Sequence, residues 1–162
     1  MSYPEPRFLG GTGEISATAR PAVAAPEVIL PTTNVHYLAT GATTGGDFGL
    51  YRWEMAGPPS GPAPHFHRSI TESFYVLSGH GWALRRQRLD RRRPRRLLFR
   101  PARRHPRLPQ RAREAGLDAD SLHPGAPREA FFVELAEIAA SGREPSEEEM
   151  TEFYRRHDQF MV

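Results

Sequence analysis

Two histidines and a glutamate stand close together in the stretch Pro64-His65-Phe66-His67-Arg68-Ser69-Ile70-Thr71-Glu72, which continues as Ser73-Phe74-Tyr75-Val76-Leu77-Ser78-Gly79. On a β-strand, side chains alternate between the two faces, so His65 and His67 point to the same side. Glu72 begins the next apolar run, which ends at a glycine turn. Two imidazoles and a carboxylate that converge in this way favour a divalent first-row metal.

The spacing H-x-H-x4-E-x6-G resembles the first signature of the cupin superfamily, small β-barrel proteins that usually hold a metal inside the barrel. The resemblance implies an all-β fold, a cupin-type double-stranded β-helix (jelly-roll) barrel with C-terminal helices, incomplete in the chain as written. It also implies that His65, His67 and Glu72 are metal ligands. Glu72 is in addition the candidate catalytic residue, as a proton acceptor during turnover.

The charge of the chain is concentrated in one segment. The 162 residues fit one domain and include no cysteine, which excludes disulfides and thiolate chemistry. All 22 basic residues are arginines, and fourteen of them lie between Arg85 and Arg113, where Asp90 is the only acid. The remaining eight arginines face eighteen acids, so the rest of the chain carries a charge of −10. The basic isoelectric point therefore describes the segment and not the whole protein.

The arginine-rich segment admits two interpretations. It has the charge of a polyanion-binding tract, but its prolines and unpaired charges conflict with the strands that a cupin barrel needs there. We therefore favour translation one nucleotide out of frame over about residues 80–123. The shifted codons permit P-G-D-F-x-F-V-P-P-G-G-I-H-G-F-R-N, which contains the second cupin signature. Its histidine, the fourth ligand of the metal site, would fall at the Pro106-Arg107 junction, and His105 is a poor substitute.

Three regions are expected along the chain. Residues 1–33 form an extended N-terminal arm, residues 34–140 form the cupin barrel with 80–123 out of frame, and residues 141–162 form a C-terminal helix. Apolar alternation predicts strands at 35–39, 48–55 and 72–77. Phe131, Phe132, Leu135 and Ile138 lie at helical spacing, which predicts a helix over 128–140. Ser146 and Glu149 form a capping-box pattern at the start of the last helix.

The resemblance implies a divalent metal cofactor, with iron, manganese, nickel and zinc left open. The in-frame parent is interpreted as a metal-dependent dioxygenase of a small aromatic or enol-like substrate, similar to quercetin dioxygenase. The alternatives are a non-catalytic cupin that binds a small molecule and an inactive frameshifted product. A small-molecule ligand and a homodimer are the expected partners, without nucleic acid or membrane. Because the sequence has no long apolar run and no signal-peptide pattern, we expect a cytoplasmic protein. His36 is expected to be a structural or surface histidine and not a ligand, and His157 to lie on the exposed side of the last helix.

Overall fold

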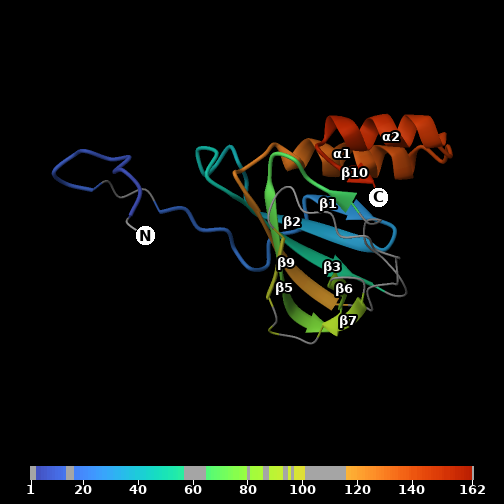
Figure 1. Ribbon diagram of the computed structural model, residues 1–162, viewed down its shortest axis with the longest axis horizontal. Helices are drawn as coiled ribbons and strands as arrows, with labels where there is room; N and C mark the ends of the chain where they lie inside the picture. The colour runs from blue at the N-terminus through green and yellow to red at the C-terminus, as the bar shows by residue number, and fades with distance from the viewer. Residues whose placement is uncertain are drawn as a thin grey trace.

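A computed structural model shows a β-sheet structure covered on one side by two helices (Figure 1). It describes residues 3–13, 17–56, 65–79, 81–85, 88–92, 95, 97–100 and 116–161. The main sheet has six strands in the order β1-β2-β3-β9-β5-β8, and every neighbouring pair is antiparallel. Its strands are β1 Val28–Leu30, β2 Thr33–Ala39, β3 Gly49–Met55, β9 Gly116–His123, β5 Thr71–Gly79 and β8 Leu97–Arg100. The prediction of an all-β class is confirmed. The expected strands 35–39 and 72–77 lie within β2 and β5, and the expected strand 48–55 begins one residue before β3.

Two small antiparallel pairs complete the described strands. β4 (His65–Phe66) pairs with β10 (Phe160–Met161), and β6 (Gly81–Arg85) pairs with β7 (Arg88–Arg92). The first pair joins the histidine segment to the C-terminal end of the chain. Figure 1 shows this pair directly below the helices, with the C-terminus beside it.

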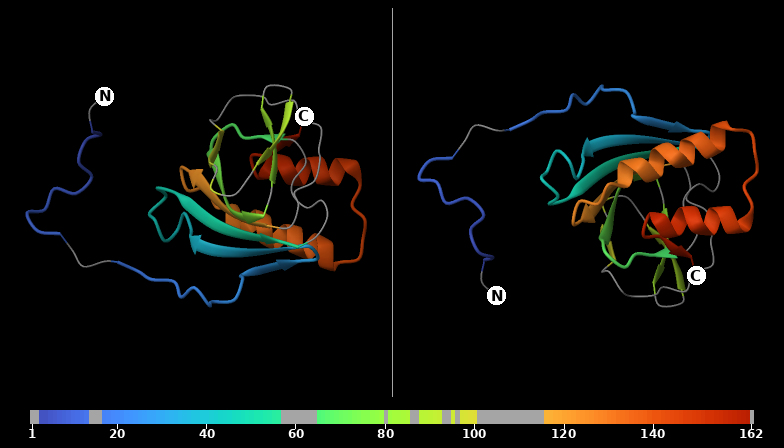
Figure 2. Two further views of the ribbon diagram at one scale, coloured as in Figure 1. Left: turned by 90° about the horizontal axis from the view of Figure 1, so that it is seen from below. Right: turned by 90° about the horizontal axis from the view of Figure 1, so that it is seen from above.

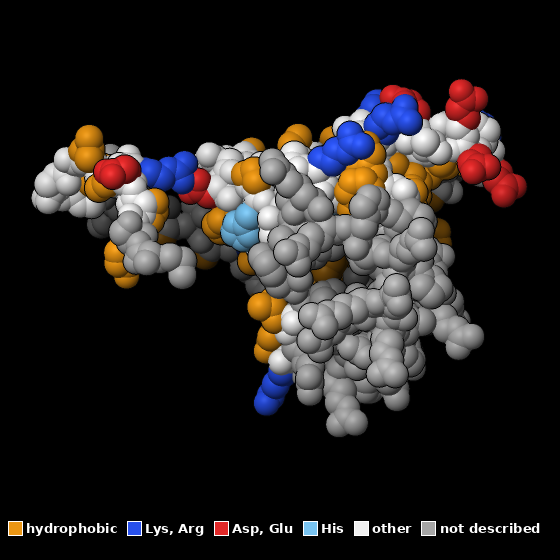
Figure 3. Space-filling model, viewed as in Figure 1, with side chains coloured by type: hydrophobic (Ala, Val, Ile, Leu, Met, Phe, Trp, Pro, Cys, Tyr) orange, Lys and Arg blue, Asp and Glu red, His pale blue; other side chains and the backbone are white. Residues whose placement is uncertain are grey.

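The first helix has the expected boundaries, whereas the second begins at the expected cap and ends at Arg156, short of the expected residue 162. α1 runs over Arg128–Ala140, and Gly142 follows it with a φ of 66°, a left-handed conformation that glycine adopts readily at a helix end. α2 runs over Glu147–Arg156 and begins with a complete capping box between Ser146 and Glu149. Acidic side chains occupy its first turn and arginines its last, which matches the helix dipole. Figure 3 shows the acidic side chains gathered at the far end of the helical layer.

The core lies between the main sheet and the helices, as the views in Figure 2 show. Phe132 is its centre: the ring lies 5.2 Å from that of Tyr51 and 5.1 Å from that of Trp53, centroid to centroid. The Tyr51 hydroxyl also donates a 2.7 Å hydrogen bond to Glu129 Oε1, and this contact fixes α1 against β3. Phe131 stacks on Phe153 at 5.2 Å and so joins the two helices.

The N-terminal residues 3–13 and 17–26 extend away from the sheet, and Arg7 forms an ion pair with Asp47 in the turn before β3 (Figure 1). β1 falls inside the range 1–33 expected for the arm, and the division into three regions stays a prediction. Within the segment 80–123, positions 80, 86–87, 93–94, 96 and 101–115 lie outside the described residues. His105 and the Pro106-Arg107 junction, where the histidine of the second signature would fall, are among them, so the frameshift also stays a prediction. Among the described residues, no helix is long and apolar enough to cross a bilayer.

Candidate metal centre

Glu72 points into the core because of its register in the main sheet. It lies opposite Leu122 of β9, and Leu122 lies opposite Gly49 of β3. Directly paired residues share a face of the sheet, so Glu72 lies on the same face as the fully buried Leu122. The exposed Tyr75 and Leu77 are on the outer side of the strand. The alternation of β5 therefore carries a carboxylate into an apolar interior.

The two histidines reach Glu72 from β4. His65 lies in β4, and His67 follows directly after the strand, with the rings 4.9 Å apart, centroid to centroid, and nearly perpendicular. The candidate ligand atoms of His65, His67 and Glu72 all lie within 4.8 Å of one another. His67 Nε2 is 3.8 Å from Glu72 Oε1. All three residues are almost completely buried, with exposed fractions of 3%, 3% and 4%.

The hydrogen bonding of His67 assigns its tautomer. Nδ1 lies 2.7 Å from the backbone oxygen of Asp158, and a carbonyl oxygen only accepts, so Nδ1 carries the proton. In the neutral ring the lone pair is then on Nε2, which is buried and has no hydrogen-bond partner among the described residues. A buried nitrogen without a partner is costly, whereas a metal ion would use this lone pair. The donor set and this nitrogen fit a divalent transition metal.

Asp158 also holds the turn that follows His67. Its carboxylate accepts hydrogen bonds from the backbone N–H groups of Arg68 and Ser69, at 3.1 and 2.8 Å, and from the Ser69 hydroxyl at 2.6 Å. Burial alone raises the pKa of the Asp158 carboxyl, but these hydrogen bonds outweigh it, and the pKa lies below its ordinary value. The turn is thus fixed from a residue about ninety positions away in sequence.

The structure brings together the three residues that the sequence singled out, His65, His67 and Glu72. Asp158 was missed by sequence reasoning, because no local pattern links it to His67. A weak signal existed: an aspartate just beyond a helix end tolerates a left-handed backbone, and Asp158 has a φ of 54°. The position expected for a fourth histidine lies outside the described residues.

His36 is a buried histidine whose contacts suit a structural role. His36 is buried, with Nε2 3.0 Å from Glu54 Oε1 and both ring nitrogens within 3.2 Å of the Arg52 guanidinium. Burial would raise the pKa of Glu54, but His36 and Arg52 lower it overall. The expectation that His36 is structural agrees with these contacts.

The expectation of an exposed His157 is wrong. Its ring packs edge-on against Phe131 and Phe153 and lies 3.1 Å from Glu134 Oε1. The reason is that α2 ends at Arg156, and from His157 the chain turns inward toward β10. Burial lowers the pKa of His157, although Glu134 opposes this shift.

Comparison with known proteins gave matches at the level of structure. No family model and no curated protein matches the sequence. A predicted oxalate decarboxylase from Thermotoga maritima superposes with a TM-score of 0.52 at 14% identity, over 68% of this chain and 100% of that chain. An RmlC-like cupin from Shewanella frigidimarina gives 0.46 at 11% identity, over 65% and 89% of the two chains. A polyketide cyclase from Streptomyces resistomycificus gives 0.42 at 22% identity, over 74% and 81%. At these identities the likeness concerns the fold and not the roles of residues.

Proposed function

We propose that this chain, whose fold is that of the cupin superfamily, binds one divalent transition metal through His65, His67 and Glu72. The observation that carries the proposal is the state of His67. Its Nδ1 is occupied by the Asp158 carbonyl, while its buried Nε2 has no hydrogen-bond partner in the part of the chain that the structure describes and lies 3.8 Å from Glu72 Oε1. A ligand nitrogen held in this way by a partner on its other nitrogen is characteristic of metal-binding histidines.

The finer proposal is a dioxygenase-like activity on a small aromatic or enol-like substrate. Two histidines and one carboxylate form the ligand set of the facial-triad iron oxygenases, which leaves coordination positions open. A bound redox-active metal would supply activation of O2. His65 and His67 would only hold it, and Glu72 would in addition accept a proton from a substrate hydroxyl. The burial of these residues excludes water from the ligand atoms.

Two alternatives predict different measurements. A non-catalytic cupin would bind metal and a small molecule without turnover. An inactive frameshifted product would bind neither, whereas a parent chain with the frame restored over residues 80–123 would bind metal. We retain a cytoplasmic location and a homodimer as proposals that rest on the sequence alone.

The experiment that tests metal binding is equilibrium dialysis of the full chain against Fe²⁺, Mn²⁺, Ni²⁺ and Zn²⁺ separately, with metal content measured by mass spectrometry. We expect one ion per chain in the wild type and a loss of bound metal in His67→Ala. The matched control is His36→Ala, which removes an equally buried histidine outside the site. Equal metal content in the two variants would reject the assignment.

Turnover is tested on the metal-loaded chain by O2 consumption with a flavonol such as quercetin. Consumption that requires the metal and falls in Glu72→Gln supports the dioxygenase proposal. Stoichiometric metal without consumption by either the chain as written or its frame-restored parent favours the binding protein instead.

A further inference from the structure

We propose that the C-terminal segment His157–Met161, here called the C-terminal hook, is the positioning device for the metal ligand His67. The inference rests on the proposed metal site, and it assigns a role to a segment that lies after both helices. Three sets of contacts carry it: the strand pair with β4, the hydrogen bonds of Asp158, and the anchoring of the hook by α1.

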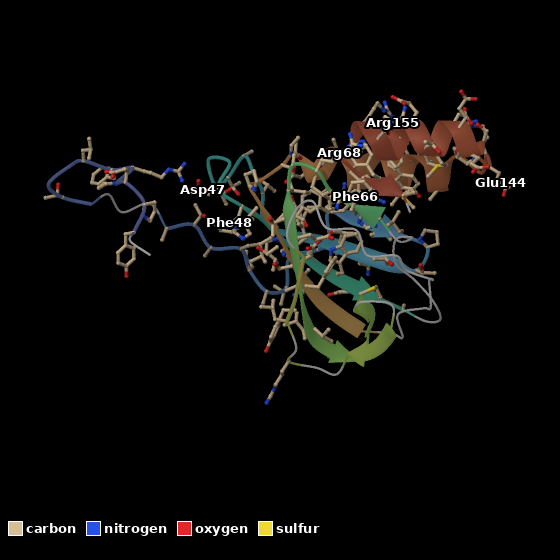
Figure 4. All side chains as sticks on the ribbon, in the orientation of Figure 1. Asp47, Phe48, Phe66, Arg68, Glu144 and Arg155 are labelled. Atoms are coloured by element: carbon tan, nitrogen blue, oxygen red, sulfur yellow. The ribbon has the colours of Figure 1, made fainter. Side chains whose placement is uncertain are left out.

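The hook is paired directly with the histidine segment. β10 and β4 are antiparallel, with Met161 opposite His65 and Phe160 opposite Phe66. The rings of Phe160 and Phe66 stack at 5.2 Å, and the Arg68 guanidinium lies 4.0 Å from the centroid of the Phe160 ring. Figure 4 labels Phe66 just below the helices and Arg68 above it, at the level of the helices. The backbone of the first ligand and the residues around the second are therefore held by the hook.

Asp158 contacts the second ligand itself. Its backbone oxygen accepts from His67 Nδ1, and its carboxylate accepts three hydrogen bonds from Arg68 and Ser69, the two residues that follow. The φ of 54° lets the carbonyl and the carboxylate of one residue reach both partners. Aspartate and asparagine adopt this backbone region more readily than most residues. One residue thus fixes the ring orientation, the tautomer and the following turn.

The residues on both sides of Asp158 are anchored by α1. Arg128, at the start of this helix, donates to the His157 carbonyl at 3.0 Å and to Gln159 Oε1 at 2.6 Å. Arg128 and Gln159 are buried, with exposed fractions of 7% and 1%. Hydrogen bonds that involve a charged and buried partner are the stronger ones. The hook is therefore held rigidly enough to direct the Nε2 lone pair of His67 toward His65 and Glu72.

The alternative is that the hook only closes the domain. The two roles differ in their consequences for His67. If the hook merely closes the domain, its loss lowers stability and leaves the zinc affinity of the folded chain unchanged. If it positions the ligand, its loss releases the Nδ1 proton from its partner, and the proton distributes over both ring nitrogens even in the folded chain.

The test uses the full chain with Asp158→Ala, which removes the three carboxylate hydrogen bonds and disfavours the left-handed backbone. Asp158→Asn keeps the backbone preference and one acceptor oxygen, and it is the second variant if Asp158→Ala does not fold. The matched control is Asp47→Ala, an aspartate on the surface that pairs with Arg7. The first readout is the zinc dissociation constant, measured by competition with a chromophoric chelator. The second is the tautomer of His67 in the metal-free protein, from nitrogen-15 NMR of the imidazoles.

We expect the zinc affinity to fall by about 10- to 100-fold in Asp158→Ala, by less in Asp158→Asn, and not in Asp47→Ala. The His67 spectrum should change from a single Nδ1–H tautomer to a mixture only in the Asp158 variants. If the wild type binds zinc and a folded Asp158→Ala chain keeps both the affinity and the tautomer, the positioning role of the hook is refuted and the metal site is not. Failure of the wild type to bind zinc would instead refute the metal site, whatever the tautomer.

Discussion

Replacement of His67 by leucine separates the metal site from the stability of the fold. In the metal-free chain the substitution has two opposing effects. It removes the buried Nε2, for which the described residues offer no hydrogen-bond partner, and it removes the hydrogen bond from Nδ1 to the Asp158 carbonyl. Loss of this Nε2 stabilises the fold. Loss of the hydrogen bond destabilises it, because the Asp158 carbonyl is left without its imidazole donor.

The magnitudes of these effects are similar, because a buried polar group without a partner costs about 1–3 kcal/mol in either case. We therefore expect the free energy of unfolding of metal-free His67→Leu to lie within about 1 kcal/mol of the wild type. A metal at 100 times its dissociation constant stabilises the wild type by about 2.7 kcal/mol. For a domain of this size, that stabilisation raises Tm by roughly 5–11 °C. The variant should show none of this increase.

The assay is thermal unfolding by circular dichroism, with and without Zn²⁺. His36→Leu is the control, because His36 is equally buried but its ring nitrogens contact Glu54 and Arg52. This control should be less stable than the wild type in both conditions and should keep the full increase with zinc. A zinc-dependent rise of Tm that persists in His67→Leu, or that vanishes in His36→Leu, would refute the reasoning.

The remaining predictions concern stability. Phe132→Ala should lower the free energy of unfolding by about 3–5 kcal/mol in denaturant titrations, because the buried ring leaves a cavity; the exposed Val133→Ala should change it by less than about 0.5 kcal/mol. Ser146→Ala should cost about 1 kcal/mol in the same assay through loss of the helix cap, and an equal stability would contradict this role. The Arg143 hydrogen bond and then the Ser146 backbone lower the pKa of Glu149 to about 2. Because this pKa is lower in the folded chain than in the unfolded chain, ionised Glu149 stabilises the fold at pH values above the unfolded pKa. This stabilisation is lost as the pH falls toward 2. Glu149→Gln should therefore narrow the difference in the free energy of unfolding between pH 6 and pH 2.

Much of the fold could be predicted because local patterns agree with the packing. Strand alternation in β3 and β5 follows which residues are buried, and the spacing of Phe131 and Phe132 predicts the face of α1 that contacts the sheet. The capping box at Ser146 is a local motif, and its geometry is present as expected. These elements need no information from distant parts of the chain.

The candidate site was predictable only in part. The spacing of His65, His67 and Glu72 indicates the candidate ligands, and two strands and one turn bring these side chains together. The role of Asp158 depends on a contact with His67, which is far away in sequence, and the spacing of apolar residues does not predict such a contact. The exposed position expected for His157 failed for the same reason, since the inward turn after α2 is set by Arg128 and Gln159.

The most direct test of the metal centre is the X-ray absorption spectrum of the zinc-loaded full chain. The account predicts one zinc per chain with two imidazole nitrogens and at least one carboxylate oxygen, the nitrogens at about 2.0–2.1 Å. The imidazole scattering should fall to one ring in His67→Ala. A spectrum with no imidazole contribution, or one that is unchanged in His67→Ala, would contradict the assignment of His65, His67 and Glu72.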